Sequence, residues 1–202
     1  MKNLIVFIFF SSCIFLTSAQ NNSLILNGAV VVNITGGAVL NIDQPHANGI
    51  VVNGSGYIQS EGETNRVAWH INNGTGNHVI PFGVAGAKID MSYNVTSAGS
   101  TDGALVASTY VTTINNTPYP SVYAPFVTTM DSTGFVGAND HSLYTADRFW
   151  VLRDIGRPWT SKPGSNLTFT YRDSEVAPGN TITETDLLAQ YWTNAQWNPG
   201  WY

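Results

Sequence analysis

The chain of 202 residues is poor in charged side chains. They make up 10% of the residues, against about 25% in ordinary globular domains. The eight Lys and Arg residues are outnumbered by 13 Asp and Glu residues, which gives a net charge of -5. A chain without a basic patch is not expected to bind nucleic acid.

Long apolar runs are missing after the first twenty residues. Met1–Asn3 supplies a positive charge, and the apolar run Leu4–Leu16 is too short to span a bilayer as a helix. Small residues then lead to Ala19. This order predicts a secretory signal peptide, residues 1–19, and a mature chain without a transmembrane segment that is secreted or held on the outer cell surface. The alternative is a lipoprotein signal that uses Cys13.

Cysteine is nearly absent, since Cys13 is the only one and lies within the predicted signal peptide. The mature chain is therefore expected to form no disulfide bond, and its stability must come from apolar burial and backbone hydrogen bonds. Thr, Asn, Gly and Val are abundant while helix formers are scarce, which indicates an all-β protein. No cofactor is predicted.

Residues 20–66 consist of short aliphatic segments separated by glycine. Gly28–Ile34, Gly37–Ile42 and Gly49–Asn53 are three similar strand-like segments. Short strands with glycine turns are typical of a β-solenoid, in which stacked rungs bury an apolar face that one rung cannot bury alone. The alternative is an antiparallel meander with Asn-Gly hairpins.

Residues 67–202 contain longer strands and are predicted to form an antiparallel β-sandwich that continues into a further C-terminal region. Ile89–Val95 and Leu167–Tyr171 alternate apolar and polar residues with the period of a half-buried strand, and Ala104–Tyr110 is a further strand after the turn Ser100–Gly103. Turn signals separate these strands, as in sandwich domains. The chain ends on Trp201 and Tyr202 without a polar tail, so we expect downstream domains of the same protein to be among its partners.

Two strand-like runs at the start of this part predict a β-hairpin. Val67–Ile71 and His78–Phe82 flank Asn72–Asn77, whose Asn and Gly residues favour turns. The hairpin would bring His70 and His78 opposite each other. Two imidazoles can begin a metal site, but zinc requires three or four ligands. A polar cross-strand pair is therefore the favoured interpretation, and no metal site is predicted.

Several motifs carry a resemblance to a family of large secreted proteins of Bacteroidota. The motifs are Ile58-x-Ser60-Glu61, Asn65-x-Val67-x-Trp69-x-Ile71, Ile80-Pro81-Phe82-Gly83, Ser108-Thr109-Tyr110, Asp147-Arg148-Phe149-Trp150, Lys162-Pro163, Leu167-Thr168-Phe169-x-Tyr171 and Leu188-Ala189-Gln190-x-Trp192. The resemblance covers residues 28–197. It implies a signal peptide, export across the outer membrane and a C-terminal type IX secretion sorting domain, which this chain lacks.

The segment Asp147–Trp150 concentrates charged and aromatic side chains. Its functional interpretation makes Asp147 a catalytic acid or Arg148 a clamp for a carbohydrate. Its structural interpretation, which we favour, pairs Arg148 with a carboxylate and lays its stem over Trp150. The spacing of the carboxylates selects no glycosidase pair. Serine-nucleophile, phosphate-loop and dinucleotide motifs are also missing from the sequence, so no catalytic residue is predicted.

Aromatic residues in loop-like context are the best indication of binding. They are Tyr119, Tyr123, Trp159, Trp197 and Trp201, each near Pro or Gly. Flat rings in loops stack on sugars and on partner proteins, so these residues are candidate contacts for extracellular glycans or surface proteins. The alternative is that the rings fill the ends of the sandwich or an interface with a downstream domain.

Two modification or ion sites have weaker support. Asp131-Ser132-Thr133 resembles the O-glycosylation acceptor of secreted Bacteroidota proteins, which makes Ser132 a candidate glycosylation site. Calcium could bind the loops Thr101–Gly103 or Asn139–Asp140, but no Asp-x-Asp-x-Asp series supports it.

These features together predict a secreted structural or adhesive β-module with no catalytic activity of its own. The first alternative is a carbohydrate-binding module that uses the loop aromatics. The second is the non-catalytic N-terminal part of an extracellular enzyme that degrades polysaccharides.

Overall fold

The computed structural model describes residues 21–131, 140–176, 179–193 and 196–199. In these ranges the only helices are three 3-10 turns of three residues, Ser142–Tyr144, Asp173–Glu175 and Glu184–Asp186. The prediction of an all-β chain is confirmed. The strands form several open sheets. Within the same ranges, no helix has the length and apolar character needed to cross a membrane.

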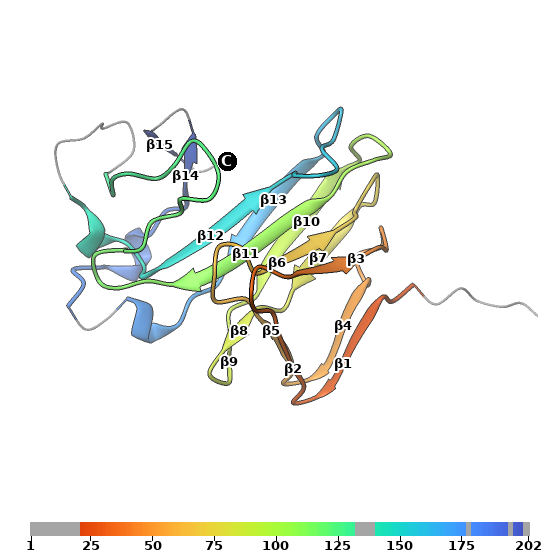
Figure 1. Ribbon diagram of the computed structural model, residues 1–202, viewed down its shortest axis with the longest axis horizontal. Helices are drawn as coiled ribbons and strands as arrows, with labels where there is room; N and C mark the ends of the chain where they lie inside the picture. The colour runs from red at the N-terminus through yellow and green to blue at the C-terminus, as the bar shows by residue number, and fades with distance from the viewer. Residues whose placement is uncertain (1–20, 132–139, 177–178, 194–195, 200–202) are drawn as a thin grey trace, which may run out of the picture.

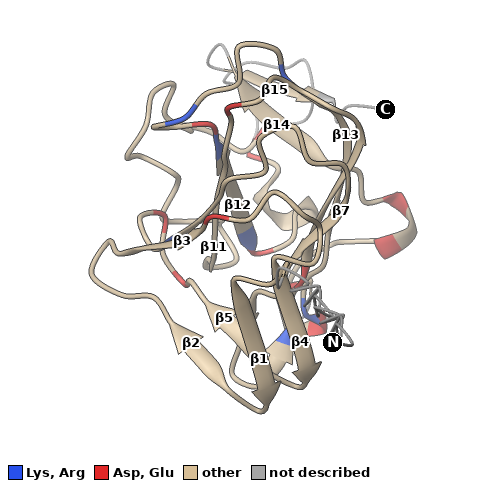
Figure 2. Cartoon of the chain, turned by 90° about the vertical axis from the view of Figure 1, so that its right-hand side faces the viewer, with Lys and Arg blue, Asp and Glu red and all other residues tan. Residues whose placement is uncertain are grey.

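The first six strands pair in parallel, each with a strand one fixed interval further along the chain. β1 (Leu24–Gly28) pairs with β4 (Ile50–Gly54), β2 (Val31–Asn33) with β5 (Tyr57–Gln59), and β3 (Val39–Ile42) with β6 (Arg66–Trp69). Partners are 26 or 27 residues apart, as Leu24 opposite Ile50 and Val39 opposite Arg66 show. Figure 2 shows β4 beside β1 and β5 beside β2. The antiparallel meander is therefore wrong for these strands.

The outer strands of this arrangement are β1, β2 and β3. Among the strands of the described residues, β1 and β2 each pair on one side only, and β3 is the last strand of a larger sheet. The three glycine-led segments of the sequence do not pair with one another, because they contribute to β2, β3 and β4. The true interval is visible in the sequence as LILNG in β1 and IVVNG in β4.

The Asn-Gly endings of β1 and β4 stack on each other. Asn53 Nδ2 donates to Asn27 Oδ1 at 3.0 Å. Gly28 and Gly54 both have positive φ, of 68° and 137°. A Cβ at Gly54 would lie 2.6 Å from the Gly28 carbonyl oxygen, so glycine at this position allows the close approach of the two turns.

Gly54→Ala is expected to destabilise the protein more than Gly86→Ala. Gly86 also has positive φ, of 83°, but a Cβ there would have no atom within 4 Å. The control should therefore lose about 1–2 kcal/mol from backbone strain alone. Gly54→Ala should lose more, because it adds a clash with the backbone of the neighbouring turn. Urea denaturation measures both, and equal losses would contradict the importance of the close approach.

Two larger sheets follow. Sheet I has the order β12-β11-β6-β3, with β11 (Leu105–Val111) and β12 (Arg148–Arg153) antiparallel to their neighbours. Sheet II has the order β13-β10-β7, formed by β7 (Gly76–Ile80), β10 (Met91–Ser97) and β13 (Gly164–Phe169). The strands predicted over Ile89–Val95, Ala104–Tyr110 and Leu167–Tyr171 thus correspond to β10, β11 and β13 within a few residues.

The predicted hairpin of Val67–Ile71 with His78–Phe82 is wrong. β6 lies in sheet I and β7 in sheet II, so the two strands do not pair. Asn72, with a φ of 53°, turns the chain away after Ile71 and donates its backbone N–H to the Gly103 carbonyl oxygen at 2.9 Å. The turn between them therefore joins two sheets.

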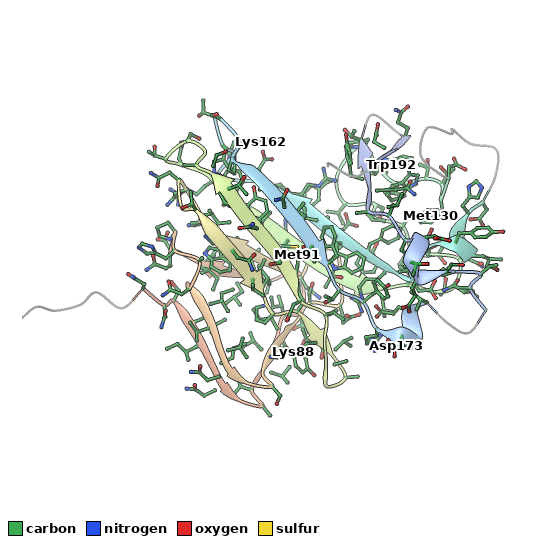
Figure 3. All side chains as sticks on the ribbon, turned by 180° about the vertical axis from the view of Figure 1, so that it is seen from behind. Lys88, Met91, Met130, Lys162, Asp173 and Trp192 are labelled. Atoms are coloured by element: carbon green, nitrogen blue, oxygen red, sulfur yellow. The ribbon has the colours of Figure 1, made fainter. Side chains whose placement is uncertain are left out.

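The N-terminal strands and the two larger sheets share one apolar core, which contains residues from both sides of the predicted boundary at residue 66. Leu26 and Ile58 from the N-terminal strands belong to the same cluster as Trp69 from sheet I and Met91 from sheet II. Figure 3 shows Met91 near the middle of the molecule. Trp150 of β12 and Phe169 of β13 also place their ring centroids 5.1 Å apart, between the two sheets. The predicted segments 20–66 and 67–202 therefore share their buried side chains.

A second, mainly aromatic cluster lies on the outer face of sheet I. Tyr110, Phe149 and Val151 point to this face and pack against Met130 and Trp197. Two small antiparallel pairs complete the fold: β8 (Gly83–Val84) with β9 (Ala87–Lys88), and β14 (Gln190–Thr193) with β15 (Gln196–Pro199). In Figure 1, β14 and β15 lie at the end of the molecule opposite β1 and β4.

Candidate functional site

The strongest candidate for a binding site is a hollow on the outer face of sheet I. Val67 and Trp69 of β6 point into the core, so Arg66 and Ala68 point outward, as does His70 directly after the strand. The hollow has a volume of about 230 Å³. Asn41 from β3 and Arg157 from the loop after β12 complete its polar lining. We call it the arginine hollow.

Three arginines meet on this face. Arg66 and Arg157 line the arginine hollow, and Arg153 lies beside it on β12. Among the described residues, the ion pairs of basic groups involve Arg148, Arg172, Lys162 and His70, and none of these three arginines. In a chain with a net charge of -5, this face therefore carries three guanidinium groups that have no carboxylate of the described chain within ion-pair distance, although Asp43 contacts His70 beside Arg157.

Tyr123 holds two of these arginines in place. The guanidinium carbons of Arg66 and Arg153 lie 5.5 and 5.3 Å from the centre of its ring, within cation–π range. Arg66 Nη1 also donates to Tyr123 Oη, and Arg153 Nη2 donates to the Tyr123 carbonyl oxygen at 3.1 Å. The Glu63 carboxylate anchors the loop by accepting the backbone N–H of Ser121 at 2.8 Å. The structure thus places Tyr123, a predicted contact residue, beside the arginine hollow.

His70 positions the third arginine. Its Nδ1 lies 3.0 Å from Arg157 Nη1 and 3.1 Å from Asp43 Oδ1. A neutral imidazole nitrogen that accepts a hydrogen bond from Arg157 cannot also donate one to Asp43. In the tautomer whose Nδ1 carries no proton, Arg157 is held against the rim of the hollow by this bond.

His78 is far from this arrangement. It is fully buried, places its Nε2 3.0 Å from the Pro45 carbonyl oxygen, and packs edge-to-face on Trp69. The predicted cross-strand pair of His70 and His78 is therefore wrong, because the two strands belong to different sheets. Among the described residues, no three His, Cys, Asp or Glu side chains gather in a way that could hold a metal ion.

Two predicted contact residues are buried. Trp159 is 8% exposed, belongs to the main core and donates its Nε1 hydrogen to the Asn72 carbonyl oxygen at 2.9 Å. Trp197 is 9% exposed and donates to the Thr129 carbonyl oxygen at 2.8 Å. Neither ring presents a free face to a sugar. Neighbouring Gly and Pro residues indicate irregular backbone. In this protein the irregular segments direct the side chains of Trp159 and Trp197 into the interior.

The remaining candidates are placed as follows. Tyr119 is half-buried and contacts Phe149 edge-to-face, with ring centroids 6.4 Å apart. Burial raises the pKa of Tyr119, and the charges of Asp140 and Asp131 raise it further. Trp201 and the predicted glycosylation site Ser132 lie outside the described residues.

Arg148 belongs to a buried ion cluster under β12. It is 3% exposed, and its Nη2 and Nε donate to the two carboxylate oxygens of Glu175 at 2.7 and 2.9 Å. Its Nη1 donates to Glu61 Oε1 and to Thr109 Oγ1, both at 3.0 Å. This geometry agrees with the structural interpretation of Arg148 as the partner of a carboxylate.

The same cluster keeps Glu175 ionised. Burial alone would raise the pKa of Glu175, but the hydrogen bond and charge of Arg148, with further bonds from Arg172, outweigh it and lower the pKa. Asp147 behaves differently: burial raises its pKa, partly offset by the hydrogen bond from Asn180. Asp147 does not line the arginine hollow.

Sequence reasoning did not single out Arg66, Arg153 or Arg157. Arg66 and His70 could have been found, because they alternate with the apolar Val67 and Trp69 on one strand. Arg153 and Arg157 join them only through the pairing of β6 with β11 and of β11 with β12, which the sequence does not specify. Comparisons with protein-family models, curated proteins and solved structures returned no match.

Proposed function

We propose that the chain is a secreted or cell-surface adhesive β-module, without catalytic activity of its own, that binds acidic glycans at the arginine hollow. One observation carries this proposal: Arg66, Arg153 and Arg157 meet on one face without an ion-pair partner among the described residues. Guanidinium groups bind carboxylates and sulfates through two parallel hydrogen bonds, so they suit the charged groups of such glycans.

The volume of the hollow limits the size of the ligand that can enter it. Its volume of about 230 Å³ is below the range of about 300–1,000 Å³ typical of pockets for whole small molecules. One charged sugar residue fits such a hollow better than a complete oligosaccharide does. The side chains of Val39 and Ile155, 41% and 40% exposed, line its rim and offer apolar contact to the face of a sugar ring.

The scaffold supports a binding role because contacts with Tyr123 and His70 fix the positions of the arginines. We interpret β1–β6 as two coils of a β-solenoid, and sheets I and II as a β-sandwich that follows it. The constant interval of 26 or 27 residues supports this interpretation. So does the parallel bridge of Ile58 with Phe82, which begins a third coil. A shared core then links the solenoid to the strands that carry Arg66 and Arg153.

Export is part of the proposal and rests on the sequence. The apolar run Leu4–Leu16, followed by small residues up to Ala19, supports a cleaved signal peptide. A mature chain without cysteine and with few charged residues also suits a protein that works outside the cell. Acidic polysaccharides are abundant there, and a rigid β-module can contact them without any chemical step.

Arg66→Ala and Arg157→Ala are each expected to weaken binding of polygalacturonate or dextran sulfate by about 10-fold or more. A hydrogen bond to a charged group contributes about 1.5–3 kcal/mol, which corresponds to this range. Isothermal titration in 150 mM NaCl measures the affinity, with neutral dextran as the ligand control. Lys88→Ala is the matched variant, because Lys88 is a cation on β9 that does not line the hollow.

The outcomes separate the hypotheses. Lys88→Ala should bind as tightly as the wild type, and an equal loss in all three variants would indicate attraction by overall charge only. If the wild type binds neither acidic polymer, the adhesive role of the hollow is wrong. Binding of polygalacturonate alone or of dextran sulfate alone would identify the group as a carboxylate or a sulfate. Cleavage of either polymer by the purified chain would refute the non-catalytic function.

A further inference from the structure

Four buried oxygen atoms near Asp147 have no hydrogen-bond partner in the described part of the protein. They are Asp147 Oδ1, Asn116 Oδ1, Asn180 Oδ1 and Thr112 Oγ1. They come from the turn after β11, the residue before β12 and the loop after Asp173–Glu175. Asn116 is completely buried. Buried side-chain oxygens almost always have a partner, so four of them in one region require an explanation.

Hydrogen bonds hold the four residues together around one stretch of backbone. Asn116 Nδ2 donates to the Ala146 carbonyl oxygen at 3.0 Å. The Thr112 backbone N–H donates to the Asp147 carbonyl oxygen at 2.9 Å. Asn180 Nδ2 donates to Asp147 Oδ2 at 3.2 Å. Asn116, Thr112 and Asn180 are thus each joined by one hydrogen bond to the Ala146–Asp147 dipeptide, although they lie far from it in the sequence.

All four atoms without a partner are oxygens, and the oxygen and nitrogen positions of the two side-chain amides cannot be exchanged. Both Asn116 and Asn180 use their NH₂ group to donate to an oxygen. Turning either amide around would set two acceptors against each other. The region therefore offers a carboxylate oxygen, two amide oxygens and a hydroxyl oxygen as acceptors. Such a set of hard, oxygen-only ligands suits calcium, which binds six to eight oxygens from carboxylates, amides, hydroxyls and water.

The neighbouring charged groups leave this set available. The Glu175 carboxylate is fully engaged by Arg148 and Arg172. The Arg148 guanidinium is directed at Glu175, Glu61 and Thr109. Within the described residues, the Asp147 carboxylate accepts a hydrogen bond from Asn180 through Oδ2, and its Oδ1 has no partner. A cation at this position would therefore face a carboxylate that no basic side chain neutralises.

We propose that Asp147, Asn116, Asn180 and Thr112 form a calcium site that ties the turn after β11 and the loop after Asp173–Glu175 to the start of β12. With one carboxylate, its affinity matches the weak class of extracellular modules, with a Kd on the order of 10⁻⁴–10⁻³ M. The site differs from the calcium loops Thr101–Gly103 and Asn139–Asp140 that the sequence suggested. It does not depend on the arginine hollow, whose lining contains none of these four residues.

Isothermal titration of the purified, EDTA-treated protein with CaCl₂ tests the proposal. We expect one site with a Kd on the order of 10⁻⁴–10⁻³ M and weaker binding of MgCl₂, because magnesium requires a tighter octahedral set. A thermal unfolding scan with and without about 10 mM CaCl₂, tenfold or more above this Kd, should show a higher Tm in calcium. NaCl at the same ionic strength is the control for screening.

Two variants and one control locate the site. Asp147→Asn removes the charge, and Thr112→Val removes one ligand with little change in shape. Each should weaken calcium binding about 10-fold or more, whereas Asp102→Asn in the Thr101–Gly103 loop should have no effect. If Asp147→Asn fails to fold, the calcium affinity of Thr112→Val alone tests whether this region binds the ion. The proposal is wrong if the wild type shows neither heat nor a Tm shift, or if only Asp102→Asn abolishes binding.

Discussion

Replacement of Arg148 by methionine is expected to lower the free energy of unfolding by about 3–5 kcal/mol, because removing one partner of a buried ion pair leaves the other charge uncompensated. Arg148 is 3% exposed and bonds both oxygens of Glu175, which is 1% exposed. The loss should lie near the lower limit, since Arg172 Nη2 stays 2.8 Å from Glu175 Oε1. Urea denaturation followed by tryptophan fluorescence measures the change.

A double-mutant cycle checks that the loss comes from the stranded carboxylate. Arg148→Met combined with Glu175→Gln should recover part of the stability, because the remaining amide carries no charge. Arg157→Met serves as the surface control and should change stability by no more than about 0.5 kcal/mol. A loss below 1 kcal/mol in Arg148→Met would show that the ion cluster contributes little to stability.

Trp69→Ala is expected to cost about 3–5 kcal/mol, the usual range for truncating a large buried side chain. Trp69 is completely buried in the core, donates to the Gln44 carbonyl oxygen at 2.6 Å and packs on His78. Its strand, β6, pairs in parallel with β3 and antiparallel with β11. The cavity would therefore loosen the N-terminal strands and sheet I together. The free energy of unfolding in urea measures the loss.

The shape of the unfolding curve gives a second test. Because one core joins β1–β6 to both sheets, Trp69→Ala should shift a single transition detected equally by circular dichroism and by fluorescence. Leu188→Ala is the control, since Leu188 is 71% exposed and should change stability little. Two separate transitions would show that the N-terminal strands and the sheets are independent folding units.

The sequence predicts the strands of this protein better than their partners. Alternation identified β10 and β13 because burying one face of a strand imposes a period of two on its own residues, whereas β11 followed from the turn signal before it. The same pattern contains no information about the sheet to which a strand belongs. For that reason Val67–Ile71 and His78–Phe82 resembled the arms of a hairpin, although their apolar faces reach the core from different sheets.

The candidate site shows the same limit. The aromatics were selected for their Pro and Gly neighbours, which report backbone irregularity and not exposure. Trp159 lies so close to Gly103 that a Cβ there would meet its ring at 2.2 Å, a contact that no local pattern encodes. The arginine hollow and the oxygens around Asp147 are each assembled from several segments distant in sequence. Only long-range pairing brings such groups together.

The outer position of β1, β2 and β3 has a consequence for how this protein can change in evolution. Each of these strands has a free side on which another parallel strand could pair. Duplication of one unit of 26 residues, inserted before Leu24, would add a layer there and extend sheet I beyond β3 without altering the residues around Asp147. The length of the molecule could thus vary between descendants while Arg66, Arg153 and Arg157 keep their places on sheet I and in the loop after β12.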